Sequence, residues 1–114
     1  PIYEQVTDKF QILILNGVLP PGSQMPSVRQ LATELSVNPN TIQRAYMELE
    51  KMGLIYPVKG RGNFVADSSQ VQKINRESYR KEFTALIQKG RNTGFNREEL
   101  EKMFAEIFEK EDES

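Results

Sequence analysis

The chain contains 114 residues, 38% of them hydrophobic, and has a net charge of −1 at neutral pH, so it is limited to one small domain with an appendage. It has no cysteine and no histidine, which excludes disulfides, thiol nucleophiles and the usual soft zinc ligands, and we expect neither a metal nor a cofactor. No apolar run approaches the length of a membrane span and no signal peptide is recognisable, which predicts a cytoplasmic protein.

The first predicted element is a helix from Ile2 to Asn16. Apolar residues recur along it at helical spacing, and Gly17 supplies a stop. The apolar positions are Tyr3, Val6, Phe10, Leu13 and Ile14. Such stripes mostly form core, so we expect this helix to pack on the back of the helices that follow rather than to hold a cofactor. Because the chain begins with Pro1 rather than Met, we also expect a few residues to precede it in the natural protein.

A pair of short amphipathic helices is predicted next. Ser27 can cap the first of them, whose apolar face comprises Val28, Leu31, Ala32 and Leu35. After the connection Ser36-Val37, Asn38 can cap the second helix, with Pro39 at its first position, where a missing amide costs nothing. Gly53 is a suitable stop for this helix, and its predicted buried stripe is Ile42, Ala45, Tyr46, Leu49 and Met52. The pattern fits a helix-turn-helix, and it also fits an ordinary packed helix hairpin.

A β-hairpin is predicted directly after the second helix. Leu54 to Val58 forms a short strand, which Pro57 places at an edge, and Asn63 to Ala66 returns as the second strand. The intervening turn, Lys59-Gly60-Arg61-Gly62, combines two glycines with two cations. Glycines let a backbone approach a phosphate closely, and the cations add sequence-independent attraction. A solvated turn is the alternative, but its place after such a helix pair favours the wing of a DNA-binding winged helix.

The chain as far as Ala66 resembles the GntR family of bacterial transcription regulators. The motifs that carry the resemblance are Met25-Pro26-Ser27-x-Arg29-x-Leu31-Ala32, Val37-Asn38-Pro39-Asn40-Thr41-Ile42-Gln43-Arg44-Ala45-Tyr46, Leu49-Glu50-x-x-Gly53-Leu54-Ile55 and Gly60-Arg61-Gly62-Asn63-Phe64-Val65, with Pro21-Gly22 upstream. The Asn-Pro-Asn-Thr start of the second helix and the short tail are most similar to the YtrA subfamily. Many family members have arginines where this chain has Pro39 and Gln43, so the base contacts of other subfamilies are not carried over.

The resemblance implies a transcription regulator that binds double-stranded DNA, and more precisely a repressor. For YtrA-like members it also implies control of a transporter operon. It implies that Arg29, in the Pro-Ser-x-Arg motif, contacts the operator and that the turn at 59–61 is the wing tip. We expect Gln43 to discriminate bases, adenine above all. Asn38, Asn40, Thr41 and Arg44 are expected to contact phosphates. The expected DNA-binding set is Ser27, Arg29, Asn38, Asn40, Thr41, Gln43, Arg44, Lys59, Gly60 and Arg61.

Two further amphipathic helices are predicted after the hairpin. The first ends at Gly90, a loop covers Arg91 to Gly94, and Asn96 caps the second, with Glu99 reaching back to it. Neither helix can bury its apolar stripe alone, and the tail is too short for a metabolite-binding domain. The resemblance implies that they form a homodimer interface. Its expected residues are Val71, Ile74, Phe83, Leu86, Ile87, Leu100, Met103, Phe104, Ile107 and Phe108.

The sequence thus predicts a mostly α (α+β) protein, with a winged helix-turn-helix DNA-binding domain at 1–67 and a two-helix dimerisation region at 68–114. Its charge is uneven, because residues 24–64 contain five basic and three acidic residues whereas residues 99–114 contain two basic and seven acidic ones. We expect the acidic end to be a solvated helix end and tail that points away from DNA. Two recognition helices held one DNA turn apart would bind a palindromic operator.

Two other functions fit parts of this pattern. A winged helix can serve instead as a protein–protein interaction module, because the fold alone does not specify its partner. The polar exposed face of the second helix favours DNA, since a protein-binding face would usually show an aromatic anchor. A carboxylate-based hydrolase comes a distant third, because no acidic residue or lysine lies in a recognisable catalytic motif.

Overall fold

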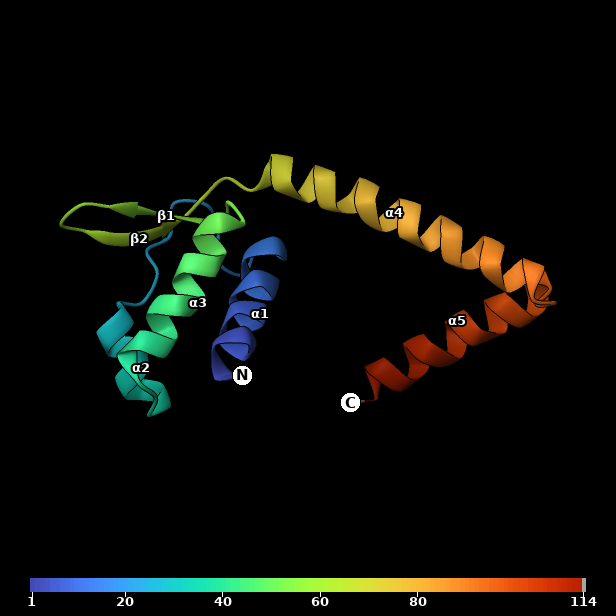
Figure 1. Cartoon of the computed structure of the whole chain (residues 1–114), viewed down its shortest axis with the longest axis horizontal. Helices are drawn as coiled ribbons and strands as arrows, with labels where there is room; N and C mark the ends of the chain where they lie inside the picture. The colour runs from blue at the N-terminus through green and yellow to red at the C-terminus, as the bar shows by residue number, and fades with distance from the viewer. Residues whose placement is uncertain (114) are drawn as a thin grey trace. The chain divides into compact units, whose positions relative to one another are not determined.

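The computed structural model describes residues 1–113 and is mostly helical, with one small sheet (Figure 1). In chain order the elements are α1 (Ile2–Leu15), α2 (Val28–Leu35), α3 (Pro39–Lys51), β1 (Ile55–Val58), β2 (Gly62–Val65), α4 (Ser69–Asn92) and α5 (Arg97–Asp112). They form two compact units, the first from Pro1 to Ile74 and the second beginning at Asn75. The predicted fold class is confirmed; Ser114, the last residue of the predicted C-terminal region, lies outside the described residues.

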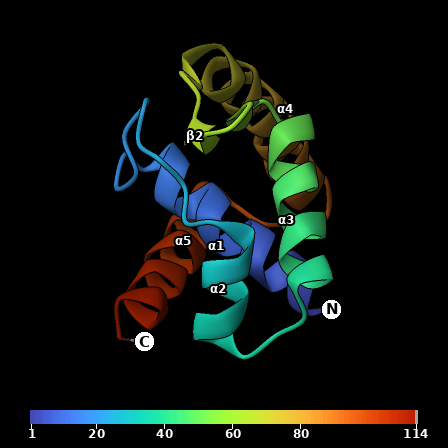
Figure 2. The same ribbon diagram turned by 90° about the vertical axis from the view of Figure 1, so that its left-hand side faces the viewer.

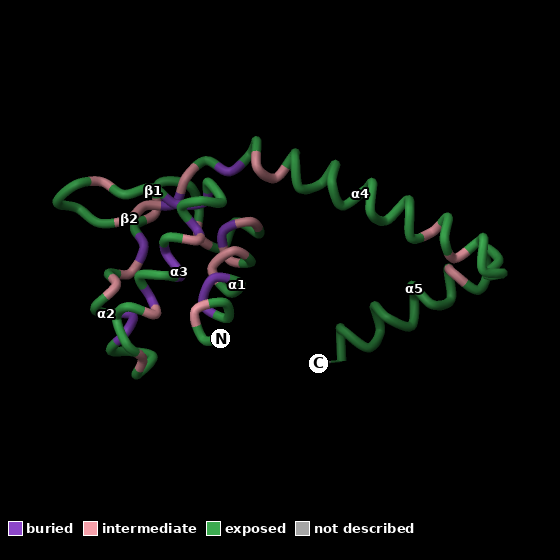
Figure 3. Tube along the Cα trace, viewed as in Figure 1, coloured by how far each residue is buried: buried purple, intermediate pink, exposed green. Residues whose placement is uncertain are grey.

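The core of the first unit surrounds α3. Helix α1 runs alongside α3, and α2 lies near its start (Figures 1 and 2). Ile42, Ala45 and Leu49 of α3 have no exposed surface, which confirms most of the predicted stripe. The other elements bury Val6, Ile14, Met25, Leu31, Ala32, Leu54, Ile55 and Val65 around them (Figure 3). Helix α1 therefore packs on the back of the helix pair, as its apolar stripe predicts.

Tyr46 links three segments of this core. Its ring meets Phe10 of α1 edge to face, with 6.0 Å between the centroids, and its hydroxyl donates a 2.7 Å hydrogen bond to the carbonyl oxygen of Pro26. That bond satisfies a hydroxyl that would otherwise be costly to bury. Burial raises the pKa of Tyr46 well above its usual range, because the phenolate would have to leave water.

Short-range signals set the ends of α2 and α3. The Ser27 hydroxyl oxygen accepts from the Gln30 amide at 3.0 Å, and the Asn38 side chain accepts from the Asn40 amide at 2.8 Å, so both predicted caps are confirmed. Two predicted core positions are wrong. Leu35 is 48% exposed, because α2 ends at it and the chain turns away through Ser36 in the left-handed region (φ 55°). Met52 is 38% exposed, because it follows the last residue of α3 as its C-cap.

The hairpin is a two-stranded antiparallel sheet with Ile55 opposite Val65 and Pro57 opposite Asn63. Leu54 precedes β1, buried in the core, and β2 begins at Gly62, one residue earlier than predicted. The chain before α2 lies along the outer side of β2, which the sequence did not predict. There Gly22 and Met25 donate to the carbonyl oxygens of Val65 and Asn63, both at 2.8 Å. This added pairing holds the hairpin from one side.

The C-terminal unit consists of most of α4 followed by α5. Helix α4 does not end at Gly90 but continues to Asn92, and Gly94, with φ 105°, follows as the left-handed residue. Gly90 is instead a point of close approach, since a Cβ there would lie 3.3 Å from a methyl group of Leu100 in α5. The capping box at Asn96 and Glu99 is confirmed in both directions, at 2.9 and 3.1 Å. None of the helices in the described chain is both long and apolar enough to cross a membrane.

The first turn of α4 belongs to the winged-helix unit. Val71 packs on its core, and the Gln72 side-chain amide donates to the Leu15 carbonyl oxygen at 3.0 Å. A single unit therefore runs to Ile74, past the predicted boundary at residue 67. Val71, predicted as a dimer residue, is used within the subunit, where its methyl group lies 3.4 Å from the position of a Cβ on Gly53.

Candidate nucleic-acid interface

The exposed side of α3 presents side chains that can hydrogen-bond and none that is acidic in its first two turns. Asn40, Gln43 and Arg44 are exposed and Thr41 is half-buried, while the intervening apolar residues face the core. Pro39 sets the first turn, and the Asn38 oxygen already caps it, so the remaining capacity of Asn38 is its amide NH₂. The helix start therefore offers exposed amide donors and an exposed guanidinium to one surface.

Arg29 lies in the first turn of α2, two residues after the Ser27 cap. Its side chain is exposed, and among residues 1–113 no acidic group pairs with its guanidinium. One turn further along α2, the Thr33 hydroxyl donates a 2.9 Å hydrogen bond to the Arg29 carbonyl oxygen. Ser27 accepts from the Gln30 amide but keeps its own hydroxyl proton free to donate. Both residues can thus give hydrogen bonds to a ligand without breaking any contact in the fold.

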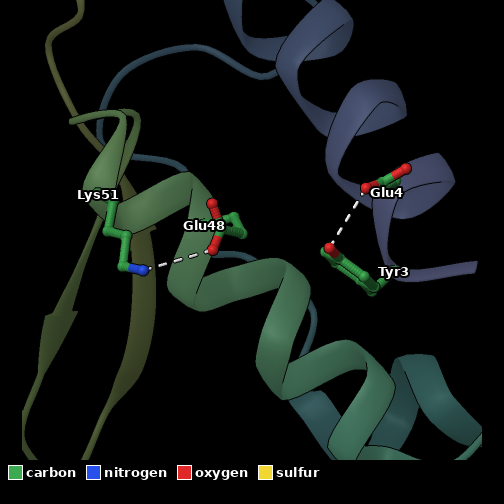
Figure 4. Close-up of polar contacts among 4 residues, drawn as sticks. All are labelled: Tyr3, Glu4, Glu48 and Lys51. Carbon is green, nitrogen blue, oxygen red and sulfur yellow. Dashed lines mark hydrogen bonds and ion pairs between the residues drawn. The ribbon is translucent and has the colours of Figure 1, made fainter. Parts of the chain in front are cut away.

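The Arg44 side chain is held by α1. Its guanidinium carbon lies 3.9 Å from the centroid of the Tyr3 ring, within the range of a cation–π contact. The Tyr3 hydroxyl donates to the Glu4 carboxylate at 3.3 Å, and one turn further along α3 Glu48 pairs with Lys51 at 3.5 Å (Figure 4). The Glu48–Lys51 pair is exposed and contributes little to stability. It pairs Lys51, the second cation of α3, with an acidic residue of the same helix.

The hairpin turn presents two cations with different degrees of freedom. Lys59 is exposed, and in the described chain it has no hydrogen-bond or ion-pair partner. The Arg61 guanidinium carbon lies 5.4 Å from the centroid of the Phe64 ring, which in turn stacks on Tyr56 at 6.1 Å. Gly60 and Gly62 have φ of 79° and 100°, so a left-handed backbone is required at both positions.

Gln24 fixes the base of this turn. Its side-chain amide donates a 2.8 Å hydrogen bond to the Arg61 carbonyl oxygen, and its backbone forms a bridge with Phe64. Gln24 and Tyr3 are neighbours of the site that the sequence did not predict. No local signal reveals them, because Gln24 contacts a residue 37 positions away and Tyr3 contacts one on another helix.

The second unit carries an apolar face that one chain leaves exposed. No residue of α4 or α5 is buried (Figure 3). Tyr79, which the sequence analysis missed, stacks on Phe83 at 6.3 Å, and Phe104 packs on Phe108 at 4.7 Å. The i, i+4 spacing of Tyr79 and Phe83 was the available signal. The exposed fractions in this unit are Tyr79 68%, Phe83 43%, Leu86 64%, Met103 41%, Phe104 55%, Ile107 55% and Phe108 55%. Ile74, the last residue of the first unit, is 65% exposed.

Residues from both helices of this unit line a hollow of about 600 Å³. Its lining includes Phe83 and Ile87 of α4 and Leu100 and Phe104 of α5. All four are predicted dimer residues, and of these Ile87 and Leu100 are half-buried. Its rim holds Arg91 and an exposed ion pair between Arg97 and Glu101 at 2.6 Å, which raises the pKa of Arg97. No group of acidic residues in the described chain could hold a metal ion.

A helix pair with a capped recognition-type helix, a glycine-containing cationic hairpin and a supporting first helix defines a winged helix-turn-helix DNA-binding protein. The chain belongs to the GntR family of bacterial regulatory proteins, whose family model matches residues 2–65. The transcriptional repressor YtrA of Bacillus subtilis is 35% identical over 109 residues, which cover 94% of this chain and 84% of that relative. This agrees with the predicted similarity to the YtrA subfamily.

Two solved structures are similar to this chain, one over nearly its whole length and the other over little more than half of it. A GntR family transcriptional regulator from Listeria monocytogenes is 34% identical with a TM-score of 0.73, covering 93% of this chain and 94% of its own. AraR(DBD) in complex with operator ORR3 is 35% identical with a TM-score of 0.55, covering 58% of this chain and 80% of its own. The protein is therefore a DNA-binding transcription regulator and not an enzyme.

Proposed function

We propose that this regulator is a homodimeric repressor that binds a palindromic operator. The observation that carries the proposal is the apolar face of α4 and α5, where seven predicted dimer residues are between 41% and 65% exposed. Full burial of such a side chain stabilises by roughly 1.5–3 kcal/mol. Covering what remains exposed of the seven would contribute on the order of 5 kcal/mol or more.

A second copy of the chain is the occupant that best fits this face. Phe83 of α4 and Phe104 of α5 line two hollows between these helices, and Phe108 lines the second, so both helices contribute aromatic groups that a two-fold related copy could cover. A stable homodimer buries about 1,600 Å² or more in total, which two helix pairs of this length can supply. The proposed interface comprises Ile74, Phe83, Leu86, Ile87, Leu100, Met103, Phe104, Ile107 and Phe108, with Tyr79 added and Val71 removed.

On the DNA side, we assign base contacts to Arg29 and Gln43. Both are exposed. Arg29 lies in the first turn of α2 and Gln43 in the second turn of α3, and they have two donors and a donor–acceptor pair, respectively, for a base edge. Ser27, Asn38, Asn40, Thr41 and Arg44 are assigned to phosphates. At the wing, Lys59, Gly60 and Arg61 are assigned to the backbone and the minor groove, because two exposed cations flank a glycine there.

Repression follows from occupancy of a promoter, and the relative named a transcriptional repressor supports that direction. The regulator would act in the cytoplasm, where the bacterial chromosome lies. Control of a transporter operon stays a prediction from the resemblance, and the genomic neighbourhood of the coding gene tests it.

In vitro selection from a pool of random duplexes tests the proposal. We expect enrichment of an inverted repeat whose half-sites are about one or two helical turns apart, about 34 Å per turn. Arg29→Ala and Gln43→Ala should relax the enriched sequence at particular positions of each half-site. Enrichment of a single, non-repeated half-site by the full chain would contradict the dimeric mode, and no enrichment at all would contradict sequence-specific binding.

A further inference from the structure

Tyr3, in the first turn of α1, contacts Arg44, an exposed residue of α3. Tyr3 presents the face of its ring to the Arg44 guanidinium, with 3.9 Å between the guanidinium carbon and the ring centroid. Cation–π attraction operates within about 6 Å, and so short a distance indicates direct stacking. Among residues 1–113 no carboxylate pairs with Arg44, and its guanidinium stacks on the ring of Tyr3.

The position of the Tyr3 ring is set by the fold. Tyr3 is half-buried and packs against the hydrophobic core, and its carbonyl oxygen accepts from the Thr7 hydroxyl at 2.8 Å. Two turns along, Phe10 meets Tyr46 of α3 edge to face, which fixes α1 against α3. The Tyr3 hydroxyl donates to the Glu4 carboxylate at 3.3 Å (Figure 4), and this contact leaves electron density on the ring, which favours a cation over its face.

Stacking leaves the useful part of Arg44 available. A guanidinium has its five N–H donors in one plane, so a ring against its flat face does not block the edges that bind a phosphate bidentately. A free arginine would have to lose rotamer freedom when it binds DNA, whereas an arginine already held on a ring has lost part of it. The stacked arrangement is therefore suited to recognition of an anion in a fixed place.

We propose that Tyr3 is a positioning residue for DNA binding, which holds the Arg44 guanidinium over α1 so that its edge meets an operator phosphate. The proposal rests on the proposed function, because Arg44 is assigned there to a phosphate. It extends the DNA-binding site to the first turn of α1, an element that otherwise serves as core.

Two other roles for Tyr3 give different results. As a purely structural residue, Tyr3 would change stability and would change DNA affinity no more than another aromatic residue of α1. If Tyr3 instead bound a phosphate directly through its hydroxyl, removal of the hydroxyl alone would abolish its contribution to DNA affinity. Phe10→Leu is the matched control for the first role, because Phe10 packs on the same seam without touching Arg44. Tyr3→Phe separates the second.

The experiment measures the affinity of the full chain for its selected duplex by fluorescence anisotropy. The variants are Tyr3→Phe, Tyr3→Leu, Arg44→Ala and the double variant Tyr3→Leu with Arg44→Ala. Loss of an exposed cation–π contact predicts about a two- to tenfold weaker affinity for Tyr3→Leu. Tyr3→Phe, which keeps the ring, should stay within about twofold of the parent. In the Arg44→Ala background Tyr3→Leu should have no further effect, since there is then no guanidinium to hold.

A DNA-free measurement accompanies the titrations. In the free chain, ring current from Tyr3 should shift the Arg44 side-chain protons upfield in NMR spectra, and Tyr3→Leu should remove that shift while Phe10→Leu keeps it. Thermal melts report how far each variant remains folded at the temperature of the titration.

Three results overturn the proposal while leaving the proposed function in place. The first is a DNA affinity of Tyr3→Leu equal to the parent's although Arg44→Ala binds more weakly. The second is additive losses of affinity in the double variant. The third is equal losses of affinity for Tyr3→Leu and Phe10→Leu. A loss in Tyr3→Phe as large as in Tyr3→Leu replaces positioning by direct contact and overturns it too. A parent chain that selects and binds no duplex overturns the proposed function and this inference together.

Discussion

Removal of the two cations at the hairpin turn should strongly reduce the salt dependence of DNA binding. Lys59 has no partner in the described chain, and Arg61 is held near Phe64 with its backbone fixed by Gln24. If each contacts a phosphate, a dimer makes four such contacts. Each contributes about −0.9 to the slope of log K against log salt, so Lys59→Ala with Arg61→Ala should flatten the slope by about 3.6.

That change is large in practice. Between 50 and 200 mM salt a slope difference of about 3.6 means that the parent loses on the order of 100-fold more affinity than the double variant. The assay is a series of anisotropy titrations across this range, on the selected duplex and on a random one, and the flattening should be the same on both. Lys51→Ala is the matched control, because it removes a cation that pairs with Glu48 at the far end of α3. A slope identical to the parent's would show that the wing does not touch DNA.

The remaining predictions concern specificity, stability and assembly. Arg29→Ala should cost about 1–3 kcal/mol on the operator and less on random DNA; equal losses on both would make Arg29 a phosphate contact. Burial raises the pKa of Tyr46 in the folded state above its unfolded value of about 10. The contribution of Tyr46 to the free energy of unfolding is therefore fully present below about pH 10 and is lost as the pH rises above it, because the unfolded chain then ionises first. The melting temperature should therefore fall above about pH 10 in the parent and much less in Tyr46→Phe, and an equal fall would contradict this. Phe104→Asp should abolish the dimer without lowering the helix content of the protomer by circular dichroism; a dimer that persists would move the interface elsewhere.

The parts of the fold that the sequence predicts well are those that short-range chemistry decides. The caps at Ser27, Asn38 and Asn96 and the stop at Gly53 each depend on hydrogen bonds or dihedrals within a few residues. Helical periodicity also identified the faces of α1 and α3. Periodicity failed to predict burial at helix ends. Leu35 has the spacing of a core residue, but it is the last residue of α2 and stays exposed.

The parts that the sequence did not predict depend on contacts between distant residues. Gly90 looked like a helix stop, but its small size serves the close approach of Leu100. Gln24 and Tyr3 act on the candidate site across the fold, and composition or spacing cannot pair a residue with one on another element. The same reason explains Val71, whose apolar side chain fits either a dimer or the core until the start of α4 is seen to pack on the core and to bond to the end of α1.

Sedimentation equilibrium of the intact chain at micromolar concentration, alone and with a palindromic duplex, tests dimeric DNA binding most directly. The protein alone should have twice the 13.1 kDa mass of one chain, and two chains should bind each palindrome. A half-site duplex should be bound far more weakly than the palindrome, because the binding free energies of two linked recognition helices roughly add. A 13.1 kDa monomer that binds its palindrome with full affinity would contradict the dimeric mechanism and leave the apolar face of α4 and α5 to another partner.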